Sequence, residues 1–323
     1  MKVDVQPDKI ILFHIGGCGA YGPIDAITHL FPAQCVVFAF EAREDKADMA
    51  LQEYYNSEGI KTYLVNACIA GAPGERDFYV NKHVESSSLF PPSEQALAEH
   101  IFPYIVPNSK VITWGENTEL DHITKLNVID LKSFTDTYHI IPDVLSVDAQ
   151  GAELEIMRGI GDSIKYINAI VSEVEFFEIY KGQGMFHEQV EFLSRYGIRL
   201  AELLSPQMWS PGTEYGKGFL TVAEALWFKS IDDFFIANNY CENLLIQGIK
   251  LAAIGFSFHR FSYSYILMKK LMDLNKEQVM VLCNQFGYEK LLTLVNMIDD
   301  NLLNYEQDRF FFVNKYITET GSC

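Results

Sequence analysis

Short apolar runs alternate with segments of helical periodicity along the first half of the chain. Ile10–Ile15, Cys35–Phe40 and Ile60–Val65 are predicted strands, because unbroken apolar runs of this length are typical of parallel strands covered on both faces. The segments between them, Pro23–Phe31 and Asp45–Ser57, are predicted helices. Strands and helices that alternate at this spacing predict a doubly wound parallel sheet.

The same alternation returns after an irregular stretch. Residues 70–125 are rich in Pro, Ser and Gly, and hairpins are predicted around Arg76–Asn81 and Lys110–Trp114. A long irregular stretch inside a compact domain indicates a functional loop, a lid or an insertion. The later predicted strands are Pro142–Val147, Tyr166–Val174, Ile198–Leu204 and Thr221–Phe228, and the later predicted helices are Ala152–Ile160 and Phe186–Tyr196. The sheet is expected to end near residue 229.

From residue 230 onward the apolar positions follow a helical spacing, which predicts three to four amphipathic helices. Leu244–Phe258 is strongly apolar, but Gln247 and Lys250 interrupt it, and it is shorter than the roughly 18–20 residues of a membrane-spanning helix. The predicted fold class is therefore α/β, with a sheet domain over residues 1–229 and an all-helical extension over residues 230–323. Packing on the sheet, a lid and a homodimer interface are the alternatives for this extension.

Composition limits the possible partners and the compartment. Lys and Arg number 25 against 43 Asp and Glu, a net charge of -18, which disfavours binding to nucleic acid or to an anionic membrane surface. The six cysteines are scattered without a CxxC pair, which favours a reducing compartment. The first residues lack the basic and apolar regions of a signal peptide. The sequence therefore predicts a cytoplasmic protein.

A glycine-rich turn follows the first predicted strand. Gly17, Gly19 and Gly22 fit the pattern GxGxxG, which lets the backbone approach a ligand closely. Glu41 ends the second predicted strand, where a carboxylate can accept hydrogen bonds from both hydroxyls of a ribose. Together these features favour an adenosine-containing cofactor. A nicotinamide dinucleotide and S-adenosyl-L-methionine both satisfy them.

Acidic residues follow two later strands. Asp148 stands at the carboxyl end of the fourth regular strand, where open α/β sheets gather their ligand-binding groups. Glu173 and Glu175 lie on one face of the next strand by alternation. Their mutual repulsion is expected to raise at least one pKa. Such a cluster suits a general base for a hydroxyl, or a site for a sulfonium and a divalent ion.

The same region carries a resemblance to a known family. The runs DVLSVDAQGAELEIMRGI and VSEVEFFEIYKGQGMFHEQVEFLSRYGIRL resemble the signature half of the FkbM family of S-adenosylmethionine-dependent methyltransferases. The positions in register are Asp148, Gly151, Glu153, Gly159, Glu173, Tyr180, Phe192, Leu193 and Gly197. The likeness spans roughly residues 10–228. One departure is His14, which stands where the family usually has an Asp that helps hold the amino group of the cofactor.

The resemblance implies a Rossmann-like class I methyltransferase sheet with helices on both faces, and O-methylation of a hydroxyl on a sugar, glycan or natural-product small molecule. It implies S-adenosyl-L-methionine as the cofactor and leaves a divalent metal open, with no metal ligands assigned. The cofactor-binding residues that it implies are Gly16, Gly17 and Gly19 facing the methionine part, Glu41 with Ala42 at the ribose, Asn66 and Ala67 near the adenine, and Asp148.

Four residues are candidates for the catalytic base: Asp148, Glu173, Glu175 and His187, with Asp148 and Glu173 favoured. The alternative function is an NAD(P)-dependent oxidoreductase on a similar Rossmann-like core. An enzyme of that class is expected to carry a Tyr-x-x-x-Lys motif, which the sheet half lacks, or a His paired with an acid after a later strand.

Overall fold

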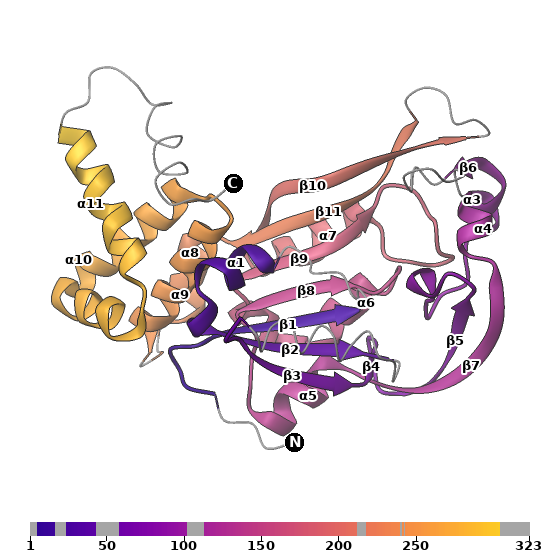
Figure 1. The fold of residues 1–323 in the computed structure, drawn as a ribbon, viewed down its shortest axis with the longest axis horizontal. Helices are drawn as coiled ribbons and strands as arrows, with labels where there is room; N and C mark the ends of the chain where they lie inside the picture. The colour runs from indigo at the N-terminus through magenta and orange to yellow at the C-terminus, as the bar shows by residue number, and fades with distance from the viewer. Residues whose placement is uncertain are drawn as a thin grey trace.

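The structure, a computed structural model, describes residues 5–16, 24–42, 58–101, 113–211, 218–239, 241 and 243–303. Its main sheet has the strand order β3-β2-β1-β8-β9-β11-β10-β6 (Figure 1). These strands are β1 (Ile10–Gly16), β2 (Cys35–Glu41), β3 (Lys61–Asn66), β6 (His100–Ile101), β8 (Val144–Asp148), β9 (Ala169–Glu175), β10 (Ile198–Pro211) and β11 (Phe219–Lys229). The five strands from β3 to β9 run parallel, and β11, β10 and β6 complete the sheet in antiparallel pairing.

Helices cover both faces of this sheet. One face packs against α1 (Asp25–Leu30), α8 (Ile231–Ala237), α9 (Leu244–Ser257), α10 (Phe261–Phe286) and α11 (Glu289–Leu303). The other face packs against α5 (Leu131–Tyr138), α6 (Glu153–Gly159) and α7 (Phe186–Ser194). β1 and β2 carry buried apolar side chains on both faces, which is why their sequences are continuously apolar. The predicted α/β fold with a C-terminal helical extension is confirmed.

A small second sheet was not predicted. It has the order β4-β7-β5, formed by β4 (Cys68–Ile69), β7 (Leu120–Ile129) and β5 (Gly74–Asn81). Of the predicted hairpin around Arg76–Asn81, only an isolated antiparallel bridge from Tyr79 to Ser88 is present, because the main partner of β5 is the distant β7. Most of the predicted hairpin at Lys110–Trp114 lies outside the described residues, and Thr113 caps α4 (Trp114–Asn117) with a capping box. α3 (Glu94–Glu99) precedes this segment.

The helical extension and the small sheet lie at opposite ends of the main sheet. In Figure 1 the extension is at the left, where the parallel strands begin, and β5 and β7 are at the right, where those strands end. Lys250 of α9 forms a buried ion pair with Asp143, just before β8, at 2.7 Å. No helix in the described ranges is long and apolar enough to cross a membrane. The predicted helix Asp45–Ser57 lies outside the described residues.

Candidate functional site

A pocket opens where β1, β2 and β8 end. Five residues of the predicted cofactor site line it: Gly16, Glu41, Ala42, Ala67 and Asp148. The parallel register explains this meeting, because Gly16 lies opposite Asp148 and the ends of β1 and β2 are neighbours. The carboxyl ends of parallel strands are the usual ligand-binding edge of an open α/β sheet.

Gly16 makes the close approach of β1 and β8 possible. Its φ of +75° lies in the left-handed region, which L side chains rarely adopt. A Cβ on Gly16 would stand 1.8 Å from the backbone oxygen of Asp148. Any larger residue would therefore push apart the two strand ends that form one side of the pocket.

The pocket also has an apolar wall. The rings of Phe40 and Phe78 and the side chain of Leu89 are almost fully buried and line it. Glu41 follows Phe40 directly, so a carboxylate stands next to an apolar surface. An adenosine needs an apolar surface for its flat base and a hydrogen-bond acceptor for its two ribose hydroxyls. The residues of this pocket fit both needs.

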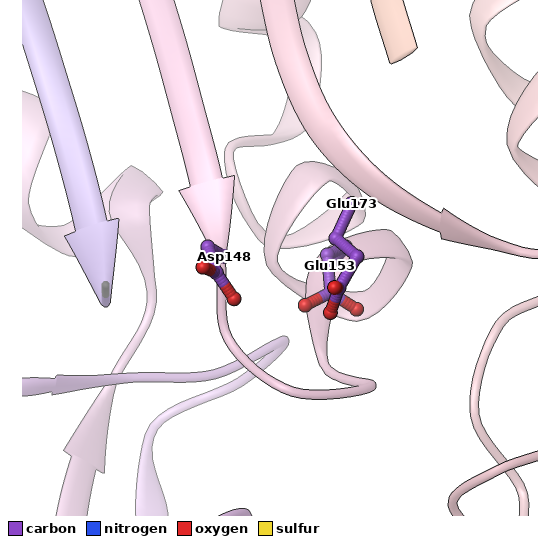
Figure 2. Close-up of side chains that lie close together, drawn as sticks. All are labelled: Asp148, Glu153 and Glu173. Atoms are coloured by element: carbon purple, nitrogen blue, oxygen red, sulfur yellow. The ribbon is translucent and has the colours of Figure 1, made fainter. Parts of the chain in front are cut away.

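Three carboxylates gather beside the pocket. Asp148 at the end of β8, Glu153 in the first turn of α6 and Glu173 on β9 each offer an oxygen within 4.8 Å of the others (Figure 2). We call these three residues the acid cluster. Asp148 belongs both to this cluster and to the pocket lining, so the two sites are continuous.

The loop between β8 and α6 holds Glu153 in place. Its carboxylate accepts hydrogen bonds from the backbone N–H of Ala149 at 2.7 Å and from the N–H of Gly151 at 3.0 and 3.2 Å. These bonds satisfy backbone donors of the loop that leads into α6. The hydrogen bonds of this loop therefore hold Glu153, in the first turn of α6, close to Asp148.

Burial is the largest cause that raises the pKa of each carboxylate in the acid cluster. Repulsion from Asp148 raises the pKa of Glu153 and Glu173 further. Glu175 is fully buried two positions after Glu173, and burial, followed by repulsion from Glu153 and Asp148, raises its pKa as well. The predicted meeting of Asp148, Glu173 and Glu175 is therefore present in the structure, with the pKa directions expected from it.

Gln150 is a residue of the site that the sequence analysis missed. Its side-chain amide donates to Asp148 Oδ1 at 2.7 Å and to Glu173 Oε2 at 3.4 Å, and its Oε1 accepts from the Tyr180 hydroxyl at 2.8 Å. Its backbone φ is +52°, an uncommon conformation for a residue other than glycine. The position of this polar residue between Asp148 and Gly151 was the sequence feature that could have indicated its place in the site.

Glu224 of β11 is a second missed residue. It is the cross-strand partner of Glu173, and burial followed by repulsion from Asp148 raises its pKa. Its sequence neighbours in β11 are apolar, so the pattern indicated only a strand. Pairing with β9 is what brings this carboxylate to the site.

Other predicted residues lie elsewhere. Asn66 is exposed at the end of β3 and does not line the pocket. His187 is exposed at the start of α7 and is also absent from the pocket lining. Gly17 and Gly19 lie outside the described residues.

His14 is buried within β1 and is not part of the pocket lining. Its Nδ1 lies 3.1 Å from Ser146 Oγ, and its Nε2 has no hydrogen-bond partner among the described residues. Burial lowers its pKa to about 4, so the ring is neutral near pH 7. A neutral imidazole offers no negative charge to the ammonium group of a cofactor.

Comparison with known proteins identifies the family. The sequence model of the methyltransferase FkbM domain matches residues 17–200, which include the acid cluster and most of the pocket lining. No curated protein and no solved structure matches the chain significantly. The matched region covers more than half of the chain and contains the motifs of the resemblance, so this protein belongs to the FkbM methyltransferase family.

Proposed function

We propose that the chain transfers the methyl group of S-adenosyl-L-methionine to a hydroxyl oxygen of a sugar, a glycan or a natural-product small molecule. The observation that carries this proposal is the continuity of two sites: a pocket with Glu41 beside an apolar wall, and the acid cluster, joined through Asp148. Family membership supports methyl transfer in general. The choice of a hydroxyl as the acceptor rests on the acidic residues, which can take up its proton.

The residues present define how the cofactor would be held. Glu41 would accept hydrogen bonds from the ribose hydroxyls, and Phe40 and Phe78 would contact the base. Ala42 and Ala67, small residues on the same lining, leave space beside the sugar and the base. When bound, S-adenosyl-L-methionine supplies a methyl group on a positive sulfonium, so positioning and exclusion of water are the protein's main tasks.

A hydroxyl acceptor must also lose its proton, and we assign this task to Asp148 or Glu173. Both are half-buried, whereas Glu153 is fully buried and its carboxylate holds the loop before α6. Burial raises the pKa of each, so in its deprotonated form each is a stronger base than an ordinary exposed carboxylate. His187, which is exposed and outside the pocket lining, is the weakest of the predicted candidates.

The proposal also covers the compartment of the protein and the class of its acceptor. Cys35, Cys68, Cys241 and Cys283 are free cysteines, which supports a reducing compartment such as the cytoplasm. The net charge of -18 supports an acceptor other than nucleic acid. A homodimer through the C-terminal helices stays a prediction.

Calorimetric titration with S-adenosylhomocysteine tests the cofactor assignment. The unaltered protein is expected to bind it, and Glu41→Ala is expected to weaken the affinity about 10- to 100-fold, because hydrogen bonds to a charged group contribute about 1.5–3 kcal/mol. Glu75→Ala is the matched control, since Glu75 is exposed on β5 and pairs with Lys125.

Two results would contradict the assignment. Equal affinity of Glu41→Ala and the unaltered protein would remove Glu41 from the ribose. Binding of NADH in place of S-adenosylhomocysteine would instead favour the oxidoreductase alternative.

A further inference from the structure

The acid cluster has no basic partner among the described residues. Within the described ranges, no lysine or arginine forms an ion pair with Asp148, Glu153 or Glu173, although ion pairs are frequent elsewhere on the chain. Gln150 donates to two of these carboxylates, but its amide carries no charge. Grouped carboxylates of this kind are expected to take up protons or to bind a cation.

Glu175 adds an independent sign of a missing ligand. Its side chain is 0% exposed, and neither carboxylate oxygen has a hydrogen-bond partner among the described residues. It leaves the same face of β9 as Glu173, and Glu153 and Asp148 are its strongest charged neighbours. It therefore lies on the side of β9 that carries the acid cluster. A buried carboxylate without any partner costs several kcal/mol, a cost that a bound cation removes.

We propose that Asp148, Glu153 and Glu173 bind one divalent metal ion, with the carboxylate of Glu175 as a further oxygen donor behind them. All donors are oxygens, which hard cations such as Mg²⁺, Mn²⁺ and Ca²⁺ prefer. Bond lengths of about 2.0–2.6 Å place ligand oxygens at most ~4–5 Å apart across one ion. The observed spacing, within 4.8 Å, meets this limit before any adjustment of the side chains.

The charge balance favours a divalent ion over an ammonium group of the acceptor. Five carboxyl groups lie at or next to the site, counting Glu175 and Glu224, and an ammonium offers only one positive charge to them. An ammonium on a bulky acceptor would also have to reach Glu153 and Glu175, both of which are 0% exposed. A metal ion is small enough to enter through the half-buried Asp148 and Glu173.

The place of the ion suggests what it does. Asp148 is shared with the pocket, so an ion bound there would stand between the cofactor pocket and the acceptor. It would orient an acceptor that offers two neighbouring oxygens, such as a vicinal diol, and favour loss of the hydroxyl proton. A carboxylate that binds the ion through one oxygen keeps its second oxygen for that proton. This role rests on the proposed function, whereas binding of the ion does not.

Electron paramagnetic resonance with Mn²⁺ tests the site directly on the full chain, without cofactor or acceptor. After treatment with EDTA and desalting, the unaltered protein is expected to remove the free Mn²⁺ signal at one ion per chain. Glu173→Gln and Glu175→Gln are each expected to weaken binding at least about tenfold, because each removes one negative charge from the donors. Glu191→Gln is the matched control, since Glu191 is an exposed acid on α7.

Thermal unfolding provides a second measurement in case a variant folds poorly. Without metal, Glu175→Gln is expected to be at least as stable as the unaltered protein, because burial disfavours a charge at this unpartnered position and the Gln amide carries none. Added Mn²⁺ is expected to raise the Tm of the unaltered protein and to raise that of the variant less.

Absence of Mn²⁺ binding to the unaltered protein, or equal binding by both variants, would overturn the proposal. Loss of S-adenosylhomocysteine binding would count against the proposed function alone, because the Mn²⁺ titration contains no cofactor.

Discussion

His14 shows how burial changes the chemistry of one residue. It lies in β1 beside Ser146 of β8, with only 3% of its surface exposed. Burial lowers its pKa from 6.5 to about 4. Between those two pH values the unfolded chain binds a proton that the folded chain does not, so a fall in pH favours unfolding. The stabilisation lost by pH 4 is on the order of 3 kcal/mol.

We therefore expect His14→Asn to reduce the acid sensitivity of the protein. The Asn amide can keep the hydrogen bond to Ser146 but does not titrate. Urea unfolding at several pH values measures the effect: the unaltered protein should lose stability relative to the variant from pH 6.5 to pH 4, and the difference should be constant above pH 7. Because the buried carboxylates titrate in both proteins, the difference isolates His14. A difference that does not change with pH would contradict the prediction.

The residues of the site differ in how far the sequence reveals them. Glu41 and Asp148 end apolar runs, so their place at the carboxyl edge of the sheet could be predicted. Gln150 could not, because its role depends on a left-handed backbone and on a hydroxyl from Tyr180, thirty positions away in sequence. Glu224 reaches the site only through the pairing of β11 with β9. Tertiary pairing is thus the information that single-residue patterns lack.

At the scale of elements, burial decides which strands could be predicted. β1, β2 and β8 are almost entirely buried, and each appears in the sequence as an apolar run. β7 is mostly exposed and has no such run, so its antiparallel pairing with β5 could not be anticipated. α5 was missed for a related reason, since its sequence LKSFTDTY is largely polar.

The contact between α9 and the start of β8 gives a prediction at this scale. Asp143 accepts from Lys250 Nζ at 2.7 Å and from the backbone N–H of Ile11 at 2.8 Å, and both charged side chains are buried. Lys250→Met should destabilise the protein by about 3–5 kcal/mol, because it leaves Asp143 charged and buried. Urea unfolding provides the measurement. Lys270→Met is the control, since its pair with Asp232 is exposed and contributes about 1 kcal/mol or less.

A double variant distinguishes the ion pair from simple loss of packing. Asp143→Asn combined with Lys250→Met removes both charges, so it should lose less stability than Lys250→Met alone. Losses that simply add would mean that the pair does not act as a unit.

At the scale of the whole molecule, the helical extension and one sheet face share a single hydrophobic core. Ile10 and Leu12 of β1 and Val37 of β2 belong to the same buried cluster as Ile249 of α9 and Leu267 of α10. The opposite face has its own core with α5, α6 and α7. The family match ends at residue 200, before the extension begins. The extension therefore completes the core of the sheet, and the site lies at the far end of the strands that it covers.

A chain that ends after Lys229 should consequently fail to fold. Without the extension, one face of the five parallel strands would expose its apolar side chains to water, and an uncovered parallel sheet is rarely stable. We expect loss of the near-ultraviolet circular dichroism signal and binding of a hydrophobic dye, while co-expression of residues 230–323 with the truncated chain should restore the fold. A truncated chain that folds alone and binds S-adenosylhomocysteine would instead make the extension an independent module. The comparison therefore decides whether the extension serves the core of the enzyme or a separate task.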